Sequence, residues 1–210
     1  MIEKVLANLR KNRMEAHFVA KKEEVLPLVK ELVAEGSTVS CGGSMTLKET
    51  GVTALLQSGY YKFEDRSAPG ISPEEKQKRE REAFFADAFF CSANAITEKG
   101  ELVNVDGYAN RIAAIAFGPR SVIVVAGINK IVPDVDAGIR RVKEIAAPLN
   151  TKRLSCDTYC FHEGKCMGLD GDMAAGCSSP QRICCSYLVC GPQRIENRIK
   201  VILVGEELGY

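Results

Sequence analysis

The alternation of apolar and polar positions predicts helices and short strands that follow one another along most of the chain. Apolar residues at helical spacing, together with capping signals, predict helices over 2–15, 22–35, 46–58, 72–88, 107–117 and 134–147. Short runs rich in β-branched and aromatic residues predict strands over 38–41, 60–63, 89–97, 101–105, 121–127 and 198–204. Strands that alternate with helices in this way are typical of an α/β fold, with a sheet flanked by helices.

Several of these boundaries have specific signals. Ser72 is a predicted N-cap followed by Pro73, and Asp134 is expected to start the helix that stops near Pro148. The sequence Glu98-Lys99-Gly100 predicts a hairpin turn between two strands. The continuous apolar run SVIVVAG at 121–127 predicts a strand that is buried on both faces.

The pattern changes at Asn150. From there to Pro192 the chain has little apolar periodicity and many Cys and Gly residues, before a strand that we expect to rejoin the main sheet. We therefore expect an α/β domain over 1–149, a Cys-rich metal- or cluster-binding segment over 150–192 inserted before the last strand, and a returning C-terminal strand within 193–210.

Composition narrows the class of protein. The chain has 210 residues, of which 46% are hydrophobic, and a net charge of +1, so neither nucleic acid nor a membrane surface is an expected partner. The apolar runs are too short to span a bilayer, and the N-terminal residues lack the features of a signal peptide. We therefore expect a cytoplasmic protein without membrane insertion.

The Cys-rich segment is the clearest candidate for chemistry. The chain has nine cysteines, an odd number, and in a reducing compartment clustered thiols favour metal binding or redox work. The cluster comprises Cys156, Cys160, Cys166, Cys177, Cys184, Cys185 and Cys190, whereas Cys41 and Cys91 are predicted to be ordinary buried thiols. The spacing leaves four alternatives open: an iron–sulfur cluster, a zinc site with His162 as a weak additional candidate, redox-active thiols, or no specific role.

A second candidate site is the turn Gly42-Gly43-Ser44, which lies between a predicted strand and a predicted helix. Such turns can bind anions through backbone N–H groups, and Thr46 could add a hydroxyl, although the turn could equally be a simple helix cap. Asn110 and Arg111 near a strand-to-helix junction, and Lys130 after the buried strand, are predicted to contact an anion in the same crevice. Each of these residues also has a purely structural alternative.

No catalytic constellation is evident, so catalytic residues are unknown and it is uncertain whether the chain is an enzyme. Glu49 and Glu98 are the carboxylates considered as a base or nucleophile, and surface or capping roles are favoured for both.

Three segments together, CGGSMTLKETG, NAITEKGELVNVDGYANRIAAIAFGPRSVIVVAGINKIV and RIKVILVGEELG, resemble the LUD family of lactate-utilization proteins, of the LutC/YkgG type. The resemblance covers nearly the whole chain. It implies a fold similar to the NagB/RpiA/CoA-transferase-like proteins, which have an α/β sheet flanked by helices.

The resemblance also implies a cofactor. Many short LUD proteins carry a cysteine module that the runs Cys160–Cys166 and Cys177–Cys184 match, so the implied ligands of a 4Fe–4S cluster are Cys160, Cys166, Cys177 and Cys184. The long run MGLDGDMAAG departs from the family pattern, and Cys156, Cys185 or Cys190 could replace a ligand.

The function implied is electron transfer in the oxidation of L-lactate or a related 2-hydroxy acid, with iron–sulfur or flavin oxidoreductase subunits as partners. The alternative is a regulatory α/β module that binds a small anionic metabolite and has a structural zinc or thiol site. A third alternative is an isomerase- or transferase-like enzyme that uses a glutamate.

Overall fold

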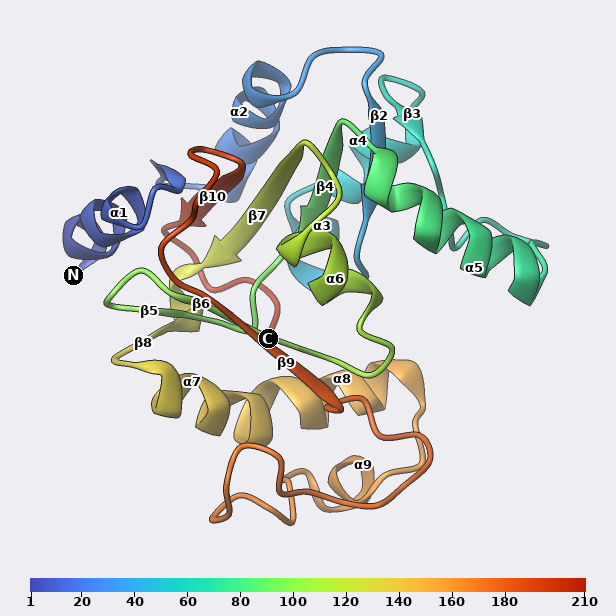
Figure 1. The fold of residues 1–210 in the computed structure, drawn as a ribbon, viewed down its shortest axis with the longest axis vertical. Coiled ribbons are helices and arrows are strands. Elements are labelled where there is room, and N and C mark those ends of the chain that lie inside the picture. Colours follow the sequence, from blue (N-terminus) through green and yellow to red (C-terminus); the bar gives the residue numbers. More distant parts are fainter.

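Two β-sheets organise the chain, and the computed structural model describes all 210 residues (Figure 1). The main sheet is fully parallel, in the order β1 (Glu15–Val19), β10 (Ile199–Val204), β7 (Ser121–Gly127), β4 (Ala88–Cys91), β2 (Thr38–Cys41) and β3 (Lys62–Phe63). The second sheet is mixed, in the order β8 (Ile131–Val132), β5 (Ala95–Thr97), β6 (Leu102–Asp106) and β9 (Ser186–Cys190). The chain therefore has the predicted α/β class, with a parallel central sheet.

The helices are short, and some of them are preceded or followed by 3-10 or π-helical turns. The α-helices are α1 (Ile2–Lys11), α2 (Val25–Leu32), α3 (Met45–Glu49), α4 (Val52–Gln57), α5 (Pro73–Glu82), α6 (Asn110–Ala116), α7 (Val135–Arg141), α8 (Ala147–Leu154) and α9 (Tyr159–Glu163). The 3-10 turns are η1 (Lys22–Glu24), η2 (Ala83–Phe85) and η3 (Ile128–Lys130), and η4 (Val142–Ala146) is a π-helical turn.

The core lies on both faces of the main sheet. In β7, Val122 and Val124 pack with α1 residues such as Leu9, whereas Ile123 and Val125 pack with residues of α2 and α4 on the opposite face. Successive side chains of a strand point to opposite faces, so the continuous apolar run of β7 fits a strand covered on both sides, as predicted.

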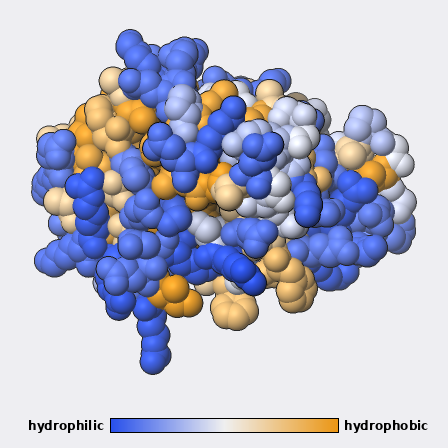
Figure 2. Space-filling model, turned by 90° about the horizontal axis from the view of Figure 1, so that it is seen from above, coloured by the Kyte–Doolittle hydropathy of each residue, from blue (hydrophilic) through white to orange (hydrophobic).

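The second sheet lies between the main sheet and the α7–η4–α8 helical stretch (Figure 1). One of its faces packs on α7, where Ala95, Val103, Val132 and Ile139 form a separate cluster. The face of the molecule shown in Figure 2 is covered mostly by hydrophilic side chains, with hydrophobic atoms showing between them. No helix has the length and apolar character needed to span a bilayer.

The strands at 38–41, 121–127 and 199–204 are confirmed, but some predicted boundaries were wrong. The first helix ends at Lys11, and a strand not predicted at all, β1, begins at Glu15 after Arg13 adopts a positive φ of 62°. The predicted helix over 46–58 is broken at Gly51, whose φ of 75° interrupts regular helical geometry.

Two further corrections concern the region around the candidate site. The predicted strand over 89–97 is two strands in different sheets, because the chain crosses from β4 to β5 between Ser92 and Asn94. The predicted stop at Pro148 is also wrong, since the helical stretch continues to Leu154. Pro148 is tolerated there because it falls in the first turn of α8, directly after the π-helical turn η4.

Residues 150–192 contain the end of α8, the short helix α9, irregular chain and β9. Because β9 pairs with β6 along its whole length, this segment contributes a strand to the second sheet. Its definition as a separate domain stays a prediction.

Candidate functional site

A cavity of about 650 Å³ opens between the two sheets and the helices α3, α5, α6 and α8. Of the seven residues predicted to bind an anion, six line it: Gly43, Ser44, Thr46, Asn110, Arg111 and Lys130. They come from three separate stretches of the chain, so the fold brings together residues that the sequence places up to 87 positions apart. The volume of the cavity is within the range of small-molecule sites in proteins.

Gly42 lies outside the cavity lining and contacts Arg111. A Cβ on Gly42 would lie 2.8 Å from Cδ of Arg111, closer than side-chain atoms normally approach. The turn therefore uses its first glycine to let an arginine pack against the backbone, and only its second glycine faces the cavity.

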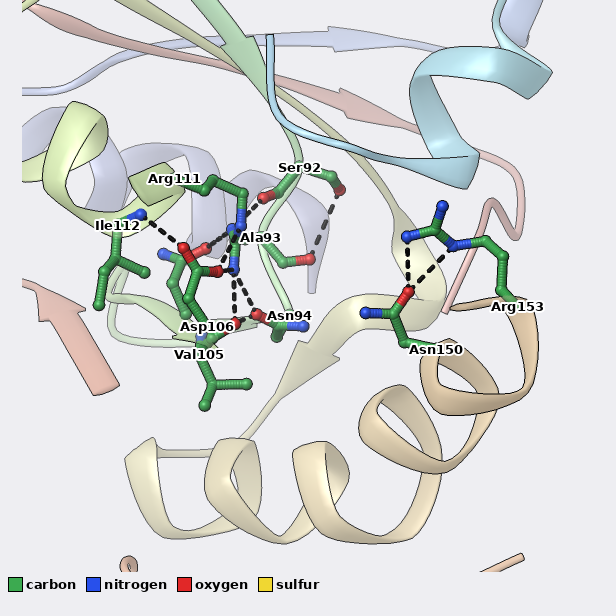
Figure 3. Close-up of polar contacts among 10 residues, drawn as sticks. Ser92, Ala93, Asn94, Val105, Asp106, Arg111, Ile112, Asn150 and Arg153 are labelled. Atoms are coloured by element: carbon green, nitrogen blue, oxygen red, sulfur yellow. Dashed lines mark hydrogen bonds and ion pairs between the residues drawn. The ribbon is translucent and has the colours of Figure 1, made fainter. Parts of the chain in front are cut away.

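Arg111 is held by a complete set of hydrogen bonds, most of which Figure 3 shows. Its five N–H groups donate, at 2.6 to 2.9 Å, to carboxylate, amide and carbonyl oxygens of Asp106, Ser92, Asn104, Asn94 and Val105. A guanidinium has five N–H donors, so none remains for a ligand. Arg111 therefore joins the strand ends around the cavity, and we expect it to position other residues there and not to contact the anion directly.

Asp106 and Asn110 are likewise engaged within the chain. Asp106 accepts a hydrogen bond from the backbone N–H of Ile112 at 2.9 Å, which satisfies a donor in the first turn of α6. Asn110 donates to Glu80 at 3.0 Å.

Two other arginines present unused donors to the cavity. Arg66 pairs with Glu80 at 2.6 Å through Nη1, and Arg153 donates to Asn150 and to the hydroxyl of Tyr210. These contacts leave Nη2 of Arg66 and Nη1 of Arg153 without a hydrogen bond in the chain. In Figure 3, Arg153 and Asn150 extend from α8, apart from the Arg111 network.

The two guanidinium groups converge at Gly43. A Cβ on Gly43 would lie 3.6 Å from Nη2 of Arg153 and 3.7 Å from Nη2 of Arg66. Because glycine has no side chain, the space between the guanidinium groups stays open to a ligand. Two planar, permanently charged groups around such a space suit a carboxylate or a phosphate.

Charge reinforces this preference. The lining includes the cations Arg66, Lys76, Arg111, Lys130, Arg153 and Arg182, but only two carboxylates, those of Glu80 and Asp106. Both carboxylates are already paired with arginines. The cavity therefore has an excess of positive charge, which attracts anions.

Lys130 is the most deeply buried cation of the cavity. Only 2% of its surface is exposed, and Nζ donates to the hydroxyls of Ser92 at 2.9 Å and Thr46 at 3.1 Å. Burial, with Arg141 and Arg111 nearby, lowers the pKa of Lys130 from its usual value to about 7.

Neither of the two glutamates considered as a base lies in the lining of the cavity. Glu49 accepts a hydrogen bond from the backbone N–H of Gly209 at 2.7 Å, and Glu98 forms an ion pair with Lys4 at 2.7 Å. These contacts give both carboxylates the structural roles favoured from the sequence.

The nine cysteines form no disulfides, and those of the predicted cluster site divide into two groups. Cys184 lies close enough to Cys166 and Cys177 for their charges to contribute to its raised pKa, whose main cause is burial. Cys160 is buried beside the hydroxyls of Thr151 and Thr158, and the thiol that it influences is Cys156.

The sulfur atoms of the first group accept N–H hydrogen bonds. Arg182 donates to Sγ of Cys184 at 3.2 Å, and the backbone of Gly168 donates to Sγ of Cys166 at 3.4 Å. Such bonds stabilise thiolates and cluster sulfurs. However, no three Cys, His, Asp or Glu side chains converge closely enough to hold a metal ion. The donor chemistry suits a cluster, but the present arrangement does not form its coordination site.

Among the cavity residues that sequence reasoning missed are Arg66, Ser92, Asn94 and Arg153. Arg66 lies in irregular chain after β3, and Arg153 lies beyond the predicted end of its helix. Ser92 and Asn94 fall in the crossing between the sheets, where the sequence pattern predicts a continuous strand. A polar Ser-x-Asn interruption in an otherwise apolar run was the available signal.

Comparisons with known proteins agree with the fold. The chain is similar to the crystal structure of a DUF162 family protein from Deinococcus radiodurans, with a TM-score of 0.53 and 15% identity over 97% of this chain and 95% of that one. At this identity the likeness shows the fold alone. No curated protein matches the chain. The family model of the LUD domain matches residues 2–204, and the chain therefore belongs to the LUD-domain family of lactate-utilization proteins, as its sequence resemblance indicated.

Proposed function

We propose that the cavity binds a small carboxylate metabolite and that the protein works in the use of L-lactate or a related 2-hydroxy acid. The convergence of Arg66 and Arg153 at Gly43 is the observation that carries this proposal. Family membership supports the pathway, and the geometry supports the charge of the ligand.

The polar groups of the cavity match the groups of such an acid. The guanidinium groups offer unused N–H donors to the carboxylate, and the hydroxyl of Ser44 and the amine of Lys130 lie in the same lining, available to the rest of the molecule. A site in which carboxylate binding depends on paired arginines discriminates against an uncharged analogue, because the guanidinium N–H donors would lose a charged acceptor.

Calorimetric titration tests this proposal. L-Lactate and pyruvate should bind saturably with one site per chain, and the uncharged lactamide should not bind detectably at the same concentrations. Affinity should fall as salt rises, because the interaction is between charges. Equal binding of lactate and lactamide, or no saturable binding of any small carboxylate, would contradict the proposal.

A second proposal concerns the Cys-rich segment, which the family resemblance links to a 4Fe–4S cluster and to single-electron transfer with iron–sulfur or flavin subunits in the cytoplasm. Its support is the cysteine spacing, the proximity of Cys166, Cys177 and Cys184, and the N–H bonds to two of the sulfurs. Loading would require the segment to rearrange, because Cys160 belongs to a different group of thiols. The alternative for this segment is a structural zinc or thiol site.

Anaerobic purification followed by assay of iron, acid-labile sulfide and zinc separates these alternatives. A 4Fe–4S cluster requires about four irons and four sulfides per chain. One zinc without sulfide would support a structural metal site, and no metal at all would leave thiol chemistry.

A further inference from the structure

Lys130 combines deep burial with the absence of a carboxylate partner. It follows β7 directly, at the carboxyl end of a strand of the main sheet, and lines the cavity. It forms no ion pair, although a buried ammonium group is normally paired. Its partners are two neutral hydroxyls.

The hydrogen bonds around Nζ suit a neutral amine. The hydroxyl of Thr46 can donate to the carbonyl of Leu208 at 3.3 Å, and that of Ser92 to the carbonyl of Ala93 at 3.4 Å. Both oxygens are then acceptors for the two N–H groups of a neutral amine. The lone pair of the nitrogen stays without a partner, and an amine with a lone pair is a nucleophile.

The charged groups around Lys130 also favour the neutral form of its amine. Arg141 and Arg111 disfavour a third positive charge, while Glu49 and Cys91 favour it more weakly. With burial as the largest contribution, the pKa of Lys130 is lowered to about 7, so a large fraction of the amine is neutral near neutral pH.

A second buried lysine shows that burial alone does not produce this arrangement. Lys143 is also buried, but its Nζ donates to the carbonyl oxygens of Gly168 and Asp172 at 2.6 Å each. Two short bonds to carbonyls stabilise an ammonium group and fix the loop, which is a structural role. Lys143 lies outside the cavity lining, whereas Lys130 lies within it.

We infer that Lys130 captures a carbonyl-bearing carboxylate, of the 2-oxo acid class, as a reversible covalent imine. This inference rests on the proposed carboxylate site, since Arg66 and Arg153 would hold the carboxylate while the ketone carbon meets Nζ. The nitrogen lone pair forms a bond to the carbonyl carbon, and the amine proton passes to the oxygen to give a carbinolamine. Loss of water, with the second amine proton, leaves the C=N bond, and no oxidant or reductant is consumed.

Reductive trapping tests the inference on the whole protein. Wild-type chain is incubated with pyruvate and cyanoborohydride near neutral pH, and adducts are mapped by peptide mass spectrometry. Lys130 should be labelled on the order of a hundredfold faster than exposed lysines, because a far larger fraction of it is neutral. Excess L-lactate, which has no ketone, should slow labelling of Lys130 and leave that of surface lysines unchanged.

Matched variants make the result decisive. Lys130→Arg should abolish the fast adduct, and Lys99→Arg, at an exposed turn position, should leave it intact. Labelling of Lys130 no faster than that of surface lysines in wild-type protein would overturn the inference, whatever the stability of the variants. If L-lactate still binds by calorimetry in that case, the imine fails and the carboxylate site survives. If lactate does not bind, both fail.

Discussion

Gly42 lies directly against Arg111, so that a Cβ on this glycine would be 2.8 Å from Cδ of the arginine. The adjacent Gly43 has no neighbour closer than 3.6 Å to the same added atom, and its neighbours there are the guanidinium groups of Arg153 and Arg66. The two glycines of one turn therefore have different roles. Gly42 permits the packing of a structural arginine, and Gly43 keeps open the space for a ligand.

Alanine at each position should separate these roles. Gly42→Ala forces Arg111 to move, and overpacking of this kind typically destabilises a protein by about 1–3 kcal/mol. Gly43→Ala meets only ordinary contacts and should change stability by less than about 0.5 kcal/mol while weakening carboxylate binding. Urea denaturation and calorimetry measure the two effects. Equal destabilisation by both substitutions would contradict the assignment.

Arg111→Met should be among the most destabilising single substitutions in the chain. It removes five hydrogen bonds and leaves Asp106, which is only 9% exposed, without its partner. Breaking a buried ion pair in this way typically costs about 3–5 kcal/mol. Arg120→Met is the matched control, since Arg120 is 87% exposed and its ion-pair distance to Asp87 is 4.0 Å. A loss below about 1 kcal/mol for Arg111→Met would refute the structural role.

Lys130→Met should stabilise the chain in a pH-dependent way. The pKa of Lys130 is about 7 in the folded chain and near its usual value when unfolded, so between these values the unfolded state binds more protons. Wild-type stability therefore rises with pH from about 7 to about 10.5, whereas this contribution is absent in the variant. The advantage of Lys130→Met should be largest below pH 7, on the order of a few kcal/mol, and should shrink as pH rises. Denaturant midpoints across this pH range give the measurement, and a constant difference would contradict it.

Sequence patterns predicted the site residues correctly where a single strand or helix determines their position. The apolar run of β7 ends three residues before Lys130, and the carboxyl end of a buried parallel strand is a common ligand position, so the sequence alone predicts Lys130 in the crevice. Ser44, Thr46 and Asn110 were found by the same reasoning about strand-to-helix junctions.

The residues, strand and contacts that the sequence did not predict depend on structural features that local sequence patterns do not reveal. Arg153 was missed because Pro148 indicates a helix end, and only the π-helical turn before it lets the helix continue. β1 was missed because this short edge strand follows a helix without any glycine or proline. The five partners of Arg111 lie in two segments, 92–94 and 104–106, so its full engagement could not be predicted from the residues next to it in the sequence.

The cysteine assignment has a direct test in variants. If the Cys-rich segment holds an iron–sulfur cluster, Cys166→Ala and Cys177→Ala should each remove most iron and sulfide from anaerobically purified protein. Cys41→Ala changes a thiol in β2 of the main sheet and should leave metal content unchanged. Retention of iron and sulfide in both segment variants would exclude these residues as ligands.

The central claim is that Arg66 and Arg153 bind the carboxylate of a small metabolite at Gly43. Calorimetric titration of L-lactate into wild type, Arg66→Gln, Arg153→Gln and the control Arg120→Gln tests it most directly. Each of the first two variants should lose roughly 10- to 100-fold in affinity, since a hydrogen bond to a charged group contributes about 1.5–3 kcal/mol. The control should bind as wild type does. Unchanged affinity in both Arg66→Gln and Arg153→Gln would contradict the account.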